Sequence, residues 1–189
     1  MRYSRRKVLG AGLGLATVGA LRARAARAAE LSTNPFTLGI ASGYPEPNAV
    51  VLWTRLAPEP LAPGGGMPNA PVAVEWEIAE DDAFRKIRRK GTAYATPDWA
   101  HSVHVEATGL EPARDYWYRF TSGGARSPVG RTRTAPAAGA AVAELKLAVA
   151  SCQYYEWGYY AAYRAIAEDA PDLVVHVGDY IYDQRGVER

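Results

Sequence analysis

Residues 145–183 read LKLAVASCQYYEWGYYAAYRAIAEDAPDLVVHVGDYIYD, and the second half of the chain is organised around this stretch. Leu145–Ser151 and Leu173–Val177 are short apolar runs without helical spacing, which predicts two strands that are buried on both faces. Between them, aromatic and apolar residues recur at the spacing of one helix face, at Tyr159, Tyr160, Tyr163, Ile166 and Ala167. Pro171 follows and ends that helix. The order strand, helix, strand predicts a βαβ unit with parallel strands.

Residues that can carry chemistry follow both predicted strands. Cys152 follows the first, and Asp179 and Tyr182 follow the second directly after Gly178. Because a βαβ crossover brings the carboxyl ends of its strands to one sheet edge, we expect these side chains to meet. A helical turn after the second strand would place Asp179 and Tyr182 on one side. Thiol and phenol groups are mostly protonated at neutral pH, and a highly charged metal ion would deprotonate both.

These motifs resemble those of one enzyme family. Ser151-Cys152-Gln153, the GYYAAY helix and PDLVVHVGDYIYD are similar to the PhoD-type alkaline phosphatases of the calcineurin-like metallophosphoesterase superfamily. That superfamily usually has Asp-x-His where this chain has Ser151-Cys152-Gln153, and the departure is itself typical of the PhoD type. Gly178-Asp179-x-x-Tyr182 also resembles the purple acid phosphatase motif, in which the tyrosine binds ferric iron.

The resemblance implies hydrolysis of a small phosphate ester substrate. It implies that Cys152, Asp179 and Tyr182 bind Fe(III), with Asp179 bridging to Ca(II), and that no catalytic residue other than these metal ligands lies in this chain. Structural alternatives stay open for each residue, since a lone cysteine is often a small buried hydrophobe and Gly-Asp is often only a turn. Their joint placement at two adjacent strand ends favours the site. His176 is interpreted as a core histidine inside the second strand, and the two remaining histidines as strand residues.

Residues 1–28 are predicted to be an export signal. Arg5 and Arg6 precede an apolar run at 8–21, which at 14 residues is too short to cross a bilayer as an anchor. The paired arginines, the modest hydrophobicity and the small residues up to Ala28 resemble a twin-arginine translocation signal. We therefore expect the twin-arginine translocase as a partner during export, cleavage after Ala28, and a periplasmic or extracellular location without a stable membrane anchor.

The charge of the chain depends on this signal. The whole sequence has a net charge of +2 at pH 7, but residues 1–28 hold seven cations and no acid. The remainder has 15 cations against 20 acids, a net charge of −5, which gives no reason to expect a nucleic-acid partner. Cys152 is the only cysteine, so an exported domain has no intramolecular disulfide and Cys152 is either a buried thiol or a ligand. We expect a monomer.

In residues 34–134, apolar and polar residues alternate with a period of two in short runs. This pattern predicts an all-β sandwich of the immunoglobulin or fibronectin III type. Seven strands are expected, at Phe36–Ala41, Val50–Leu56, Val72–Ala79, Gly91–Thr96, Ser102–Thr108, Asp115–Thr121 and Val129–Thr134. The turn before Asp115 resembles a tyrosine corner with Tyr116 as the corner residue. The basic cluster at 85–90 lies beside acidic residues and is interpreted as a solvated turn between strands.

The predicted organisation therefore has two domains. The sandwich at 34–134 is followed by an alanine-rich linker at 135–143 and, at 144–189, by the first βαβ unit of an α/β metallophosphoesterase core that is incomplete in this chain. Later metal ligands are missing, because no Gly-Asn-His motif follows Asp183. We expect an inactive amino-terminal fragment of a longer enzyme. The alternative is a non-catalytic exported binding module or a decayed relic, and the DNA beyond the codon for Arg189 distinguishes the two.

Overall fold

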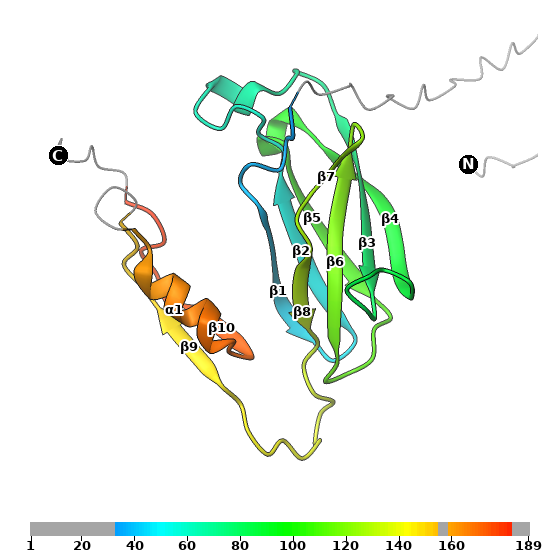
Figure 1. Cartoon of the computed structure of the whole chain (residues 1–189), viewed down its shortest axis with the longest axis vertical. Helices are drawn as coiled ribbons and strands as arrows, with labels where there is room; N and C mark the ends of the chain where they lie inside the picture. Colours follow the sequence, from blue (N-terminus) through cyan, green and yellow to red (C-terminus); the bar gives the residue numbers. More distant parts are fainter. Residues whose placement is uncertain (1–32, 155–158, 183–189) are drawn as a thin grey trace, which may run out of the picture.

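The computed structural model describes residues 33–154 and 159–182. They form a β-sandwich and a smaller βαβ unit, which an extended segment connects (Figure 1). The predicted fold class is confirmed. The domain boundaries at 34–134, 135–143 and 144–189 stay predictions, and the predicted signal at 1–28 lies outside the described residues.

The sandwich consists of two antiparallel sheets. Its strands are β1 (Ile40–Glu46), β2 (Ala49–Arg55), β3 (Val72–Ala79), β4 (Ile87–Ala95), β5 (Ser102–Thr108), β6 (Asp115–Ser122), β7 (Ala125–Arg126) and β8 (Gly130–Arg133). One sheet has the order β1-β2-β5, and the other has the order β4-β3-β6-β7 with β8 also paired to β6. Two short 3₁₀ helices, η1 (Pro63–Gly66) and η2 (Pro97–Trp99), lie in the loops before β3 and β5.

The core lies between the two sheets, as the period of two requires. On β6 every second side chain is buried, and Tyr116, Tyr118 and Phe120 are at most 3% exposed. The facing sheet contributes residues such as Leu52 on β2. These large side chains supply most of the apolar area that the sandwich removes from water, so its stability resides in them.

The predicted tyrosine corner is confirmed. The hydroxyl of buried Tyr116 accepts a hydrogen bond of 2.8 Å from the backbone N–H of Glu111. Beside it, the Thr134 hydroxyl accepts from the N–H of Arg114 at 3.1 Å and donates to the Glu111 carbonyl at 2.6 Å. The two hydroxyls fix the turn before β6 to the end of β8, which satisfies backbone groups that lie near the core.

The first strand differs from its prediction at Phe36–Ala41. β1 begins only at Ile40, because Phe36 is buried against the core and the chain turns between these residues. The turn is closed by a hydrogen bond of 3.1 Å from the Gly39 N–H to the Phe36 carbonyl, and Gly39 has a φ of 76°. Phe36 is therefore apolar because it anchors the chain to the core before the strand begins, and not because it belongs to the strand.

The basic cluster was also misassigned. β4 begins at Ile87, so residues 88–90 are strand residues that pair with β3, with Lys90 opposite Glu77 and Arg89 opposite Ile78. An edge strand tolerates such a run because its outer side faces solvent. The short strand β7 was not predicted, so eight strands rather than seven occur among the described residues of the sandwich.

The predicted βαβ unit is confirmed in topology. It contains β9 (Leu147–Ala150), α1 (Ala161–Asp169) and β10 (Leu173–His176), and the two strands pair in parallel from Leu147 opposite Leu173 to Ala150 opposite His176. The helix begins later than its aromatic pattern predicts, after Tyr160 with a left-handed φ of 52°. Among residues 33–154 and 159–182, no helix has the length and apolar character needed to cross a membrane.

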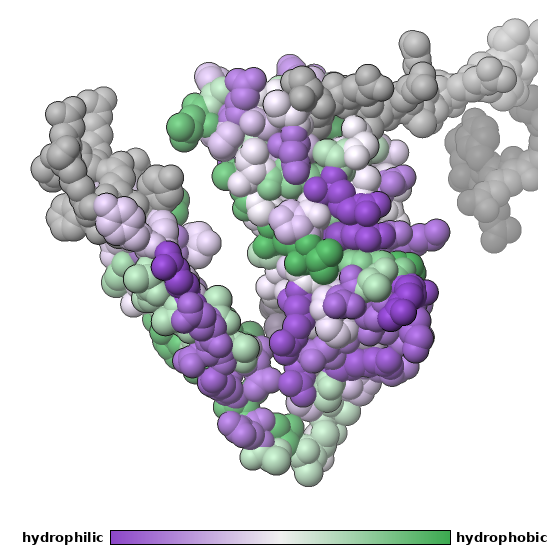
Figure 2. All heavy atoms as spheres, viewed as in Figure 1, coloured by the Kyte–Doolittle hydropathy of each residue, from purple (hydrophilic) through white to green (hydrophobic). Residues whose placement is uncertain are grey.

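The prediction that both strands of this unit are buried on two faces is wrong. The exposed fractions of Val149, Val174 and Val177 are 65%, 46% and 64%, and α1 contains no buried residue. One helix covers one face of a two-stranded sheet and leaves the other face open among the described residues. Figure 2 shows hydrophobic residues on the outer surface of this unit.

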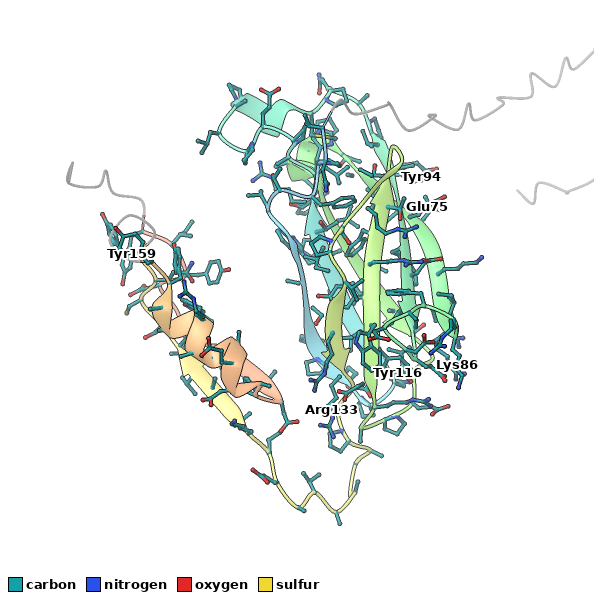
Figure 3. The ribbon with its side chains drawn as sticks, in the orientation of Figure 1. Glu75, Lys86, Tyr94, Tyr116, Arg133 and Tyr159 are labelled. Carbon is teal, nitrogen blue, oxygen red and sulfur yellow. The ribbon has the colours of Figure 1, made fainter. Side chains whose placement is uncertain are left out.

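The two parts meet through an ion pair at the start of the βαβ unit. The guanidinium of Arg133, at the end of β8, lies 2.9 Å from Oδ1 of Asp172. The other carboxylate oxygen of Asp172 accepts a hydrogen bond of 2.9 Å from the backbone N–H of Lys146. Asp172, which directly precedes β10, therefore links the sandwich to the backbone directly before β9. Figure 3 shows Arg133 at this end, and Tyr159 at the opposite end of the unit.

Candidate metal centre

The backbone brings the ends of β9 and β10 together. Beyond the last paired strand residues, the N–H of Cys152 donates to the Gly178 carbonyl at 3.2 Å, and the N–H of Gln153 donates to the Asp179 carbonyl at 2.9 Å. These bonds continue the parallel pairing past both strands, as the crossover geometry predicts. Residues far apart in sequence therefore leave the sheet side by side at its carboxyl edge.

Both exits turn sharply. Cys152 and Asp179 have φ values of 56° and 51°, in the left-handed region that residues other than glycine rarely adopt. Gly178 has a φ of 126°. A Cβ at Gly178 would meet no atom within 4 Å, so its backbone conformation, rather than lack of space, favours glycine. Backbone strain of this kind is concentrated at functional sites, and here it falls on two of the three predicted ligands.

The three predicted side chains converge on one oxygen. The Tyr182 hydroxyl donates to Oδ2 of Asp179 at 3.0 Å, and the Cys152 thiol lies 3.6 Å from the same atom. The predicted helical turn is not how they meet, because 179–182 is irregular. Cys152 is exposed, so the alternative of a small buried hydrophobe is wrong. The carboxylate of Asp179 is the common acceptor of this cluster.

The hydrogen bonds of the cluster hold the phenol in its protonated form. The pKa of Tyr182 is raised above its ordinary value, first through its side-chain contact with Cys152 and then through its hydrogen bond to Asp179. A phenolate beside the Asp179 carboxylate would bring two negative charges together. A positive charge in place of the shared proton would favour the ionised phenol.

These donors fit a single metal ion. Two donor atoms that bind one ion at about 2.0 to 2.3 Å lie about 3 to 3.7 Å apart. The separations of 3.0 and 3.6 Å about Asp179 fall in this range. A site with three protein donors requires the phenol of Tyr182. Within 33–154 and 159–182, no group of three histidine, cysteine or acidic side chains is close enough to hold an ion.

Comparison with known families identifies the chain. The PhoD-like phosphatase N-terminal domain matches residues 22–136, more than half of the sequence, and the PhoD-like phosphatase domain matches residues 147–189. The chain belongs to the PhoD-like phosphatase family. The resemblance deduced from the strand-end motifs is thereby confirmed.

A curated relative and a solved structure show how much of their length this chain covers. Alkaline phosphatase D of Bacillus subtilis (strain 168) is 57% identical over 180 residues, which cover 94% of this chain and 30% of that protein. A solved structure described as the structure of PhoD is 60% identical and has a TM-score of 0.78, over 80% of this chain and 29% of that one. The chain thus spans about 30% of the length of the curated relative that it matches.

One aromatic neighbour of the PhoD-like site was missed. The ring of Tyr154 lies 5.5 Å from the ring of Tyr182, with 31° between their planes. Tyr154 also lines a hollow of about 340 Å³ next to Cys152. The tyrosines that follow Cys152 in sequence were the only signal for this contact. They show no strand or helix period, so the sequence did not indicate which of them would face the candidate site.

The histidine interpretations need correction. His176 ends β10, but it is only half-buried; its ring lies 4.9 Å from that of Tyr180, and its Nδ1 accepts a hydrogen bond of 3.4 Å from the N–H of Gly178. His104 is a strand residue of β5. His101 precedes β5, is 3% exposed and has a φ of 56°, so it is a buried turn residue rather than a strand residue. A single histidine in a turn carries no period by which to recognise it.

Proposed function

We propose that this chain is part of an exported, metal-dependent phosphate ester hydrolase. The observation that carries the proposal is the convergence of Cys152 and Tyr182 on Oδ2 of Asp179 at the carboxyl ends of two parallel strands. Ligands of α/β proteins bind at this edge. Membership of the PhoD-like phosphatase family supports the same reaction class.

The donor set favours iron(III) with calcium as its neighbour. A phenolate and a carboxylate are hard oxygen donors, and a thiolate adds a softer one that a first-row transition metal accepts. Calcium takes oxygen ligands only, and Asp179, whose carboxylate has two oxygen atoms, is the side chain that would also hold Ca(II), as the family resemblance implies. In this proposal Cys152 and Tyr182 would bind the iron but not the calcium.

The chain's own groups have definite tasks in this proposal. Asp179 orients Cys152 and Tyr182 through the two contacts to its Oδ2 atom. Both of these side chains lose their protons when a metal binds, which makes metal affinity depend on pH. The left-handed turns at Cys152 and Asp179 fix where the donors point. When bound, metal ions supply Lewis-acid stabilisation of phosphoryl oxygens and an activated water.

Metal analysis of the complete gene product tests the proposal. We expect bound iron and calcium, with a visible absorption band from charge transfer between the thiolate or phenolate and iron(III). Cys152→Ala and Tyr182→Phe should each shift or remove this band and lower phosphatase activity at least about tenfold. Tyr180→Phe is the matched control, because Tyr180 is 63% exposed and contacts His176 instead. A colourless and fully active Cys152→Ala protein would overturn the iron assignment.

We propose export by the twin-arginine translocase, which carries folded proteins and so suits a metal site assembled before export. Replacing Arg5 and Arg6 together with lysine should keep the protein in the cytoplasm, since the signal is read by its paired arginines. Cell fractionation measures this, with Arg22 and Arg24 replaced by lysine as the control. Normal yield outside the cytoplasm from the Arg5/Arg6 variant would contradict this route and leave the hydrolase proposal intact.

A further inference from the structure

The hollow beside Cys152 is lined by aromatic side chains. It measures about 340 Å³ and lies between the exit of β9, at 151–154, and the start of α1, at 159–163. Four of the nine described residues that line it are tyrosines: Tyr154, Tyr159, Tyr160 and Tyr163. Among these nine, none is Asp, Glu, Lys, Arg or His. An aromatic surface thus adjoins a site whose donors suit a cation.

Ring contacts connect this surface to the candidate metal centre. The ring of Tyr154 lies against that of Tyr182, 5.5 Å away with 31° between the planes. On the other side, the rings of Tyr160 and Tyr163 meet edge to face at 5.8 Å. Cys152 belongs both to the lining and to the donor cluster. A molecule held at the donors would therefore have its next atoms at the mouth of the hollow.

Tyr159 is the most accessible ring of the lining. Its side chain is 85% exposed and lies at the carboxyl-edge end of the unit, as Figure 3 shows. Aromatic side chains bind planar ring systems by stacking and edge-to-face contact, and such surfaces with a few polar groups are typical of small-molecule sites. An alkyl chain would gain apolar contact but no stacking, and a free phosphate would gain little from these ring faces.

We propose that the hollow holds the leaving group of the phosphate ester and makes the enzyme prefer esters with a planar aromatic leaving group. This inference rests on the proposed hydrolase function and specifies the substrate class of that site. The phosphoryl group lies at the donors Cys152, Asp179 and Tyr182, and the aromatic ring lies among Tyr154, Tyr159 and Tyr160. Tyr159 is then a specificity-determining residue.

Kinetics of the complete gene product test this on phenyl phosphate and ethyl phosphate. The two esters differ in intrinsic reactivity, so the informative quantity is the change in the ratio of their kcat/KM values between variants. Tyr159→Leu should lower the phenyl-to-ethyl ratio about fivefold to tenfold. Tyr44→Leu is the matched control, since Tyr44 is a 77% exposed tyrosine on β1, and it should leave the ratio unchanged. An unchanged ratio in Tyr159→Leu overturns the inference.

A binding measurement separates this inference from the proposed function. Calorimetric titration with phenylphosphonate and methylphosphonate compares ligands of equal charge that are not hydrolysed. We expect phenylphosphonate to bind about tenfold more tightly, and Tyr159→Leu to abolish the difference. Equal affinities, or a preference that survives in Tyr159→Leu, would overturn the aromatic subsite even in an active phosphatase. A protein that hydrolyses no phosphate ester but keeps the Tyr159-dependent preference would refute the hydrolase proposal and support the subsite.

Discussion

The sandwich and the βαβ unit carry similar apolar strands but bury them to different extents. In the sandwich, Leu52 and Phe120 are fully buried between two sheets. In the βαβ unit, Val149 on β9 and Val174 on β10 are 65% and 46% exposed although the two strands pair with each other as predicted. The strands therefore pair in both regions, whereas their apolar side chains are buried in only one.

This difference separates topology from stability. A parallel pair with a crossover helix is specified locally, by two apolar runs and a helix between them. The free energy that makes a domain fold alone comes from apolar area removed from water, and a two-stranded sheet with one helix removes too little. The candidate metal centre thus lies on the part of the chain that depends on further packing.

The largest test of this comparison is to separate the two regions. A polypeptide of residues 31–136 should fold alone, with a cooperative urea transition, because its core is closed. A polypeptide of residues 144–189 should show no cooperative transition, since none of its described residues is buried. Circular dichroism and tryptophan fluorescence measure both. Cooperative unfolding of the second polypeptide would show that its exposed strands are sufficient for folding.

Truncating one strand residue in each region sharpens the comparison. Leu52→Ala should destabilise the sandwich by about 2 to 5 kcal/mol, because it leaves a cavity between the sheets. Val149→Ala should change the free energy of unfolding by less than about 0.5 kcal/mol, as expected of an exposed site. Urea denaturation of the 189-residue chain, followed by fluorescence, gives both values. Equal losses in the two variants would contradict the assigned burial.

The tyrosine corner gives a smaller effect within the sandwich. Tyr116→Phe removes the acceptor of the 2.8 Å hydrogen bond from the Glu111 N–H, while the ring keeps its packing. We expect a loss of about 1 to 2 kcal/mol, the range for leaving a buried donor unpaired. Tyr94→Phe is the control, since Tyr94 is 56% exposed on β4. A denaturation midpoint equal to that of the parent chain would remove the corner as a stabilising feature.

The smallest effect is expected where the two regions meet. Arg133→Gln should cost about 0 to 1 kcal/mol in global stability, because its ion pair with Asp172 is partly exposed. It should nevertheless widen the distribution of distances between the regions in small-angle scattering. Arg131→Gln is the matched control, since Arg131 pairs with Asp115 inside the sandwich. An identical scattering profile for the parent and Arg133→Gln would show that the ion pair does not fix the arrangement.

Much of the fold followed from local patterns. Most strands of the sandwich, the parallel βαβ unit and the corner at Tyr116 were predictable, because each depends on a residue period or a turn within one short segment. The start of β1 was not, because Phe36 is apolar as an anchor before the turn at Gly39. The strand residues at 88–90 were missed because a basic run on an edge strand looks like a solvated turn.

The convergence of the three candidate ligands was predictable, but the geometry by which they meet was not. Cys152, Asp179 and Tyr182 were selected because parallel strands end at one edge, and the structure brings their side chains together. The route by which Tyr182 returns to Asp179 was mispredicted, since a three-residue spacing also suits an irregular loop. Tyr154 was missed because its contact with Tyr182 depends on the mutual placement of two loops, which no local period encodes.

The carboxylate of Asp172 lies at the contact about which the βαβ unit would rotate relative to the sandwich. It contacts Arg133 of the sandwich at one end of the βαβ unit, whereas the candidate metal centre lies beyond the opposite end of the same strand. The strand β10 between them has four residues, Leu173–His176, and spans about 13 Å. A rotation of about 10° at Asp172 would move the carboxyl end of this strand, where the donors lie, by about 2 Å. A small rotation at this ionic contact thus produces a larger displacement at the candidate site.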